Sequence, residues 1–232
     1  MPALADSPAA ELEPTNPAPL AVALEVGSKM VFATALDWPG WCRRAKGELA
    51  AIDRLLDYAP RYATILRRAG LALPADYQAQ IVERLPGGAG TEFGAPGVVA
   101  EDERRPMDAA EASRRARILA AAWEAFDDVA AAAPEALRKG PRGGGRDTSA
   151  IVSHVVECDR GYYGPKIGVR HKPFAPEDRK ALQALRQDML DRLSQASDGQ
   201  PLVERGWTAR FALRYITWHV LDHLWEIEDR SE

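Results

Sequence analysis

The segment 214–230, RYITWHVLDHLWEIEDR, is the feature that most constrains how this chain can fold. Its apolar residues recur at helical spacing without an interrupting Pro or Gly, and His219 and His223 stand four residues apart within it. Residues four apart on a helix project about 40° from each other around the axis, so both imidazoles lie on one face. Two imidazoles at this spacing can bind one metal ion. Because two ligands rarely complete a metal site, the pattern predicts a third ligand from elsewhere in the chain.

The composition is that of a globular protein and restricts the choice of partners. The chain has 232 residues, of which 46% are hydrophobic and 28% charged, enough for one medium domain or two small ones. A formal net charge of −4 argues against a protein that binds nucleic acid over a wide surface. Cys42 and Cys158 are far apart, which argues against a disulfide framework and favours a reducing compartment.

The sequence also carries no membrane or export signal. No apolar run reaches the roughly 20 residues that a membrane-spanning helix needs. The N-terminus lacks the basic and apolar regions of a secretory signal. We therefore expect a cytoplasmic protein with neither a membrane nor a nucleic-acid partner.

The N-terminal part of the chain divides into three regions. Residues 1–20 are rich in Pro, Ala and acidic residues and are expected to form a disordered or extended tail. Residues 21–85 predict a small β-β-α-β segment, with a hairpin turn at Gly27-Ser28 and a helix broken or kinked near Ala59 by the following Pro60. Residues 86–107 are rich in Gly and Pro and are expected to be a linker or a loop draped over the next domain.

From residue 108 to 230 the pattern is purely helical. Asp108, with Glu111 three residues later, predicts the N-terminal cap of a long first helix. Four amphipathic helices in succession predict an antiparallel four-helix bundle, in which metal sites are built from side chains that face the axis. The fold class is therefore α+β overall. The helices are expected to begin near residues 108, 147, 177 and 208, with the second ended by Gly161, Gly164 and Pro165.

The third metal ligand is expected to be His154. It lies on the core-facing side of the second helix, where burying a Leu or Val side chain would cost less free energy than burying an imidazole. His171 is the weaker candidate, because it lies in a Pro-flanked segment outside any helical pattern. The alternatives for His219 and His223 are that they are hydrogen-bonded core histidines, or that their rings stack on Trp218 and Trp225.

These residues carry a resemblance to a known family. A His in the second helix, in SHVVECDRGYY, and a His pair in the fourth, in WHVLDHLWEIED, resemble the DinB-like four-helix-bundle superfamily over residues 106–230. The resemblance implies one divalent metal, zinc or nickel, bound by His154, His219 and His223. Some members of that superfamily are transferases or isomerases that use a low-molecular-weight thiol, and many have no assigned activity.

A second resemblance lies outside the helical region. The β-β-α-β segment over 21–85, with the run FATALDWPGW, resembles the start of HicB-like antitoxin folds. This resemblance implies a head that binds a partner, whereas the simpler alternative is a small α+β cap of purely structural use. Trp218, Leu221 and Trp225 form a second apolar stripe on the last helix, and either the N-terminal segment or a second copy of the chain is expected to cover it.

Three side chains near the predicted ligands are candidates for further roles. Glu157, three residues after His154, is either a ligand, a base acting on metal-bound water or a solvated carboxylate. Asp222 is expected to orient a histidine, carry a proton or pair with Arg214. Cys158, one turn beyond His154, is either a thiolate ligand or a small packed residue.

The loop RKGPRGGGRD before the second helix is a candidate anion site. Glycines ahead of a helix N-terminus expose backbone N–H groups, and Arg142 and Arg146 add positive charge that suits a carboxylate or phosphate of a substrate or cofactor. The loop lacks the Lys and Ser or Thr of a P-loop. The alternative is a flexible, solvated turn.

Taken together, the patterns and the resemblance favour a metal-dependent enzyme acting on an unidentified small molecule. A divalent metal on three imidazoles activates water or a thiol, which suits a hydrolase or a thiol-dependent transferase or isomerase, with Glu157 or Asp222 as the proton carrier. The alternative is a non-enzymatic, metal-stabilised module that binds a partner through its N-terminal segment.

Overall fold

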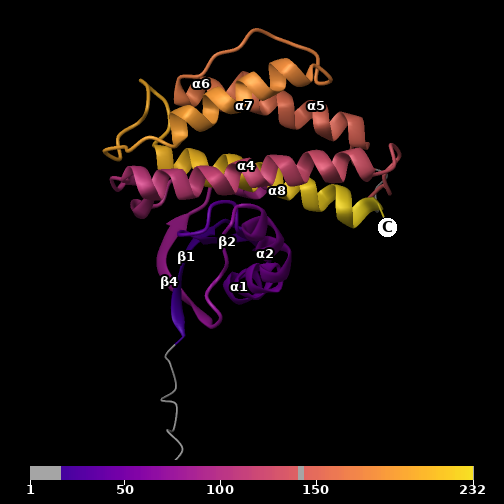
Figure 1. Cartoon of the computed structure of the whole chain (residues 1–232). Helices are drawn as coiled ribbons and strands as arrows, with labels where there is room; N and C mark the ends of the chain where they lie inside the picture. The colour runs from indigo at the N-terminus through magenta and orange to yellow at the C-terminus, as the bar shows by residue number, and fades with distance from the viewer. Residues whose placement is uncertain (1–16, 141–143, 232) are drawn as a thin grey trace, which may run out of the picture.

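The computed structural model describes residues 17–140 and 144–231 and has the mixed α+β class that the sequence predicts. A four-stranded sheet with two helices lies on one side of a layer formed by the long helices α4 and α8, and α5, α6 and α7 lie on the other (Figure 1). Residues 1–16 of the predicted tail 1–20 lie outside the described part of the chain, whereas residues 18–20 belong to the first strand and not to a tail.

The sheet has the strand order β3-β2-β1-β4. β1 (Ala18–Val26) and β2 (Val31–Ala35) form the predicted antiparallel hairpin, and β4 (Tyr77–Pro86) returns parallel to β1. Val26 pairs with Val31, and the Gly27 N–H donates to the Met30 carbonyl at 2.9 Å. The turn therefore centres on Ser28-Lys29, one residue later than the predicted Gly27-Ser28.

The N-terminal unit contains one strand that the prediction missed. β3 (Cys42–Ala45) pairs antiparallel with β2, and the predicted β-β-α-β order has no strand at this place. The strand is short and half of it is Arg, so it lacks the alternation that marks longer strands. The expected helix is divided into α1 (Glu48–Asp57) and α2 (Ala59–Arg68), with Pro60 in the first turn of α2, where its missing N–H is tolerated.

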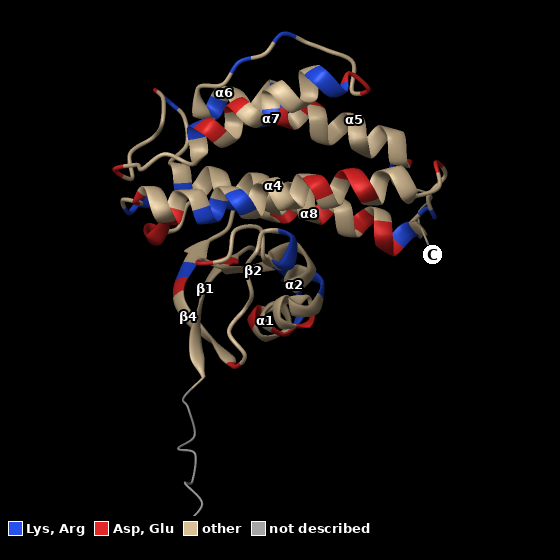
Figure 2. Ribbon diagram, viewed as in Figure 1, with Lys and Arg blue, Asp and Glu red and all other residues tan. Residues whose placement is uncertain are grey.

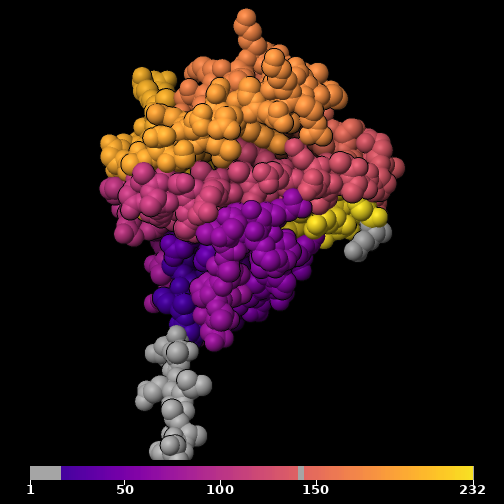
Figure 3. Space-filling view, in the orientation of Figure 1, coloured from indigo at the N-terminus to yellow at the C-terminus, as the bar shows by residue number. Residues whose placement is uncertain are grey.

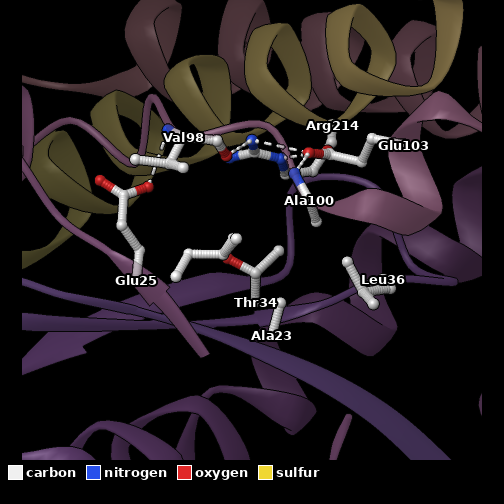
Figure 4. Close-up of a pocket in the computed structure, with 9 residues that line it drawn as sticks. Ala23, Glu25, Thr34, Leu36, Val98, Ala100, Glu103 and Arg214 are labelled. Atoms are coloured by element: carbon white, nitrogen blue, oxygen red, sulfur yellow. Dashed lines mark hydrogen bonds and ion pairs between the residues drawn. The ribbon is translucent and has the colours of Figure 1, made fainter. Parts of the chain in front are cut away.

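The segment between the sheet and the long helices contains α3 (Ala89–Phe93) and the short 3-10 helix η1 (Glu101–Arg104). It is held against the sheet by Glu25, whose carboxylate accepts from the Thr91 hydroxyl at 2.5 Å and the Val98 N–H at 2.9 Å. Figure 4 shows Glu25, Val98 and Arg214 around a cavity of about 10 Å³, room for about one water molecule. The segment therefore follows a defined path over the sheet.

The long helices begin close to where the sequence predicts. α4 (Ala109–Ala132) is capped by Asp108, whose side chain accepts from the Glu111 N–H at 2.8 Å. α7 (Arg179–Leu193) is capped by Asp178 in the same way, and α8 runs over Ala209–Ser231. α8 packs against α4, α5 and α7. No helix of residues 17–140 or 144–231 is both long and apolar enough to cross a membrane.

The second of these helices continues further than predicted. α5 (Thr148–Cys158) passes directly into a π-helical turn, η2 (Asp159–Tyr163), and then into α6 (Gly164–Ile167). Gly161 and Gly164 therefore do not end the helix, because a glycine is compatible with a π turn and Pro165 stands in the first turn of α6. A π turn inserts one extra residue and rotates the following side chains around the axis.

The N-terminal unit covers the second apolar stripe of α8. Trp218 contacts Phe32 of β2 edge to face, with ring centroids 6.2 Å apart, and Trp225 contacts Tyr58 at 5.0 Å. Basic residues of α2 meet the acidic ends of α4 and α8 at the same junction (Figure 2), where Arg61 pairs with Asp229 at 2.7 Å. In the space-filling view the N-terminal unit lies directly against the helical layer (Figure 3).

Candidate metal centre

Three histidines from two helices converge in the structure. α5 provides His154, and α8 provides His219 and His223 from successive turns of one face. Their ligating nitrogens all lie within 4.8 Å of one another. The Nε2 atoms of His154 and His219 are 3.2 Å apart. In a tetrahedral site with metal–nitrogen bonds of about 2.05 Å, two nitrogens are about 3.3 Å apart, so this pair has the spacing that a shared metal requires.

The surroundings of the three rings keep water away from one side. His219 is 7% exposed, and the ring of Tyr163 packs on it edge to face with centroids 5.2 Å apart. Tyr163 is the last residue of the π turn that follows the ligand-bearing helix. The buried Nδ1 atom of His219 has no hydrogen-bond partner among the described residues. The site is therefore enclosed around His219.

Burial keeps two of the imidazoles uncharged. It lowers the pKa of His154 to about 4, with further contributions from the charges of His223 and Arg146. Burial also lowers the pKa of His219 well below its usual value, assisted by the proximity of the other two histidines and of Arg146. A neutral imidazole has the free electron pair that a metal ion needs. The donors present at neutral pH are thus chemically suited to a divalent metal.

A carboxylate on α8 orients the third imidazole. The Nδ1 atom of His223 is 2.8 Å from Oε2 of Glu226, and Arg230 donates to the other oxygen of Glu226 at 2.6 Å. The hydrogen bond from His223 lowers the pKa of the Glu226 carboxyl. An Nδ1–H held by a carboxylate leaves Nε2 free to bind metal. Glu226 is not among the site residues predicted from the sequence; its position three residues after His223 was the available signal.

The two predicted proton carriers are engaged in ion pairs. Both oxygens of Glu157 accept from Arg160, the shorter contact being 2.5 Å, and 65% of the Glu157 side chain is exposed. Asp222 pairs with Arg43 of β3 at 2.9 Å, rather than with Arg214 as the sequence suggested. Neither carboxylate is hydrogen-bonded to a histidine in the described structure. We therefore assign neither residue a direct contact with the metal group.

Cys158 lies beside the first imidazole. Its Sγ atom is 3.8 Å from both ring nitrogens of His154, and burial raises the pKa of the thiol to about 11. His171, the weaker ligand candidate, pairs with Asp188 at 2.7 Å and is not part of the group of three histidines.

The predicted anion loop is described only in part. Arg142 lies outside the described residues, whereas Arg146 is exposed and close enough to lower the pKa of His154 and His219 through its charge. A hollow of about 600 Å³ adjoins this loop and is lined by the basic residues Arg138, Lys139 and Arg230 and by Glu226. Positive charge is thus present next to the histidines.

Comparisons with protein-family models, curated proteins and solved structures find nothing that matches this chain.

Proposed function

We propose that this chain is a metal-dependent enzyme of the DinB-like type, with zinc or nickel bound by His154, His219 and His223. In this proposal α4, α5, α7 and α8 form the antiparallel four-helix bundle that the sequence predicts. The convergence of three imidazoles from two helices that are distant in sequence carries the proposal. His219 is only 7% exposed and its Nε2 atom faces that of His154 at 3.2 Å, and a metal ion between the two nitrogens would satisfy both electron pairs.

A divalent metal bound by the three imidazoles would lower the pKa of a bound water or thiol and polarise a carbonyl, which suits hydrolysis or thiol-dependent transfer and isomerisation. The residues of this chain would prepare the site for that chemistry. Glu226 and Arg230 hold His223 in the tautomer that presents Nε2. Tyr163 shields His219 from water. Arg146 supplies positive charge that favours an anionic substrate or a low-molecular-weight thiolate.

Elemental analysis of protein purified without chelator tests this proposal. We expect a stoichiometric divalent metal in the wild type and its loss in a His154→Ala/His219→Ala double variant. His171→Ala is the matched control, because His171 pairs with Asp188 outside the group and should leave the metal content unchanged. Wild-type protein that is purified without metal and does not bind added zinc or nickel would exclude a metalloenzyme. A loaded protein would then be screened against hydrolytic and thiol-transfer substrates.

A second candidate is a non-enzymatic module whose metal stabilises the contact between the helices and a HicB-like head. Two ion pairs between the N-terminal unit and α8 favour this candidate, one between Arg43 and Asp222 and one between Arg61 and Asp229. His223→Ala distinguishes the two functions. A variant that loses turnover but keeps its melting temperature supports the enzyme, whereas a lower melting temperature without turnover in the wild type supports the module.

A further inference from the structure

We propose that the substrate of this site is a small aromatic anion, whose ring is bound by an aromatic surface beside the three histidines. This inference rests on the proposed function and names the class of its substrate. We define the aromatic surface by three residues whose rings are at least partly exposed: Tyr162 of η2, Trp207 in the segment before α8, and Tyr215 of α8. None of the three has a role in binding the metal.

Ring contacts join the exposed part of this surface to the histidines. Tyr162 is 53% exposed, one of four large hydrophobic side chains that are exposed in the described part of the chain. Its ring centroid is 5.5 Å from that of Tyr163, which packs on His219 at 5.2 Å. The other three exposed side chains all precede α4 in the chain. Tyr162 is therefore the one that is connected to a proposed metal ligand, through two successive ring contacts.

The three rings are packed together as one surface. Tyr162 meets Trp207 edge to face, with centroids 5.6 Å apart and an angle of 82° between the planes. Trp207 meets Tyr215 in the same way at 5.3 Å and 64°. Because each ring is held by its neighbours, little side-chain freedom is lost when a ligand binds. Aromatic side chains bind flat apolar groups through stacked or edge contacts, so this surface suits the ring of a ligand.

Tyr215 places a hydroxyl on the side of this surface that is nearest the histidines. Burial raises the pKa of this hydroxyl to about 12, and the neighbouring Tyr162 hydroxyl and Cys158 thiol contribute to the shift. Sγ of Cys158 is itself 3.8 Å from both ring nitrogens of His154. The Tyr215 hydroxyl keeps its proton at neutral pH and is available to donate a hydrogen bond to a ligand that lies between the aromatic surface and the histidines.

Positive charge lies on the opposite side of the histidines. Arg146 precedes α5 and Tyr162 lies in the π turn that follows it, so they stand beyond opposite ends of the helix that bears His154. The charge of Arg146 contributes to the lowered pKa of His154. The same order is found on α8, where Tyr215 precedes the two histidines and Arg230 follows them. This arrangement is complementary to a molecule with a ring at one end and a negative charge at the other.

Calorimetric titration of the zinc-loaded, full-length protein with 4-phenylbutyrate and 4-cyclohexylbutyrate tests the inference. The two acids have the same charge and linker, and simple hydrophobic binding favours the cyclohexyl acid. We expect the wild type to bind 4-phenylbutyrate more tightly. Tyr162→Ala should weaken that binding about 3- to 10-fold, whereas Tyr162→Phe should retain it. Phe93→Ala is the matched control, because Phe93 is a 90% exposed aromatic residue on α3, and it should leave the affinity unchanged.

The zinc content of the same samples separates failure of this inference from failure of the proposed function. In protein that contains zinc, three results overturn the aromatic surface as a binding site and leave the metal site in place: no binding of either acid, equal or tighter binding of 4-cyclohexylbutyrate, or equal effects of Tyr162→Ala and Phe93→Ala. Protein that takes up no zinc overturns the proposed function, and with it the substrate class inferred from that function.

Discussion

Arg214 and Glu103 form a buried ion pair that attaches α8 to the segment lying over the sheet. Nε of Arg214 is 2.6 Å from Oε1 of Glu103, and each side chain is only 4% exposed. Arg214 also donates to the carbonyls of Pro96 at 2.6 Å and Val98 at 3.2 Å. Figure 4 shows Arg214 beside Glu103 and Val98. Because Arg214 precedes His219 by little more than one helical turn, this contact positions the helix that bears two of the three histidines.

Replacing Arg214 with Met should therefore be strongly destabilising. The change leaves the Glu103 carboxylate buried without its partner, which costs about 3–5 kcal/mol in comparable pairs. Chemical denaturation of the variant and the wild type measures the difference. Glu204→Ala is the matched control: Glu204 and its partner Arg205 are 91% exposed, and such a pair contributes less than about 1 kcal/mol. Equal losses in the two variants would contradict this account.

Asp159 should make the stability of the protein depend on pH. Burial raises the pKa of this carboxyl from 3.8 to about 7. Between about pH 4 and pH 7 the unfolded chain releases the proton while the folded chain retains it, so stability falls as pH rises through this window. The loss is on the order of 4 kcal/mol at most, from about 1.4 kcal/mol per unit of pKa.

An Asp159→Asn variant removes this titration. Asn can still accept the hydrogen bond from Trp123, which is 2.9 Å long in the wild type. Urea denaturation at pH 4 and pH 8 should show the stability of the wild type falling relative to that of the variant. Parallel pH profiles for the two proteins would mean that Asp159 ionises normally in the folded state.

Glu226 should control the affinity for metal without being a ligand. Removing a carboxylate that orients a metal-binding histidine typically lowers metal affinity about 10- to 100-fold. We expect a loss of this size in Glu226→Ala and a smaller one in Glu226→Gln, whose amide oxygen still accepts from His223. Competition with a chromophoric chelator measures both. Glu228→Ala, on the same helix but paired with Arg61, should leave the affinity unchanged.

Metal should stabilise the folded chain through the three histidines. At a free metal concentration about 100 times the Kd, binding to the folded state alone adds about 2.7 kcal/mol. Thermal scans with zinc and with chelator should differ accordingly in the wild type and coincide in the His154→Ala/His219→Ala variant. A shift of the same size in that variant would place the responsible site elsewhere.

Much of the local structure follows from short-range patterns. The cap formed by Asp108 and the division of the first helix at Pro60 are both present, because each depends on backbone groups a few residues away. The pair His219 and His223 shares a helix face for the same reason. The strand β3 was missed because four residues with two arginines carry no periodic signal, and only its pairing with β2 makes them a strand.

The candidate site likewise has features that local periodicity predicts and features that only tertiary packing determines. The spacing of His219 and His223, the inward position of His154 and the α+β class are consequences of helical and strand periodicity, which any sequence displays directly. Tertiary packing alone decided that Nε2 of His154 lies 3.2 Å from Nε2 of His219 and that Asp222 forms an ion pair with Arg43 of β3. Periodicity specifies the face of a helix on which a side chain lies, whereas its partner depends on how helices distant in sequence pack together.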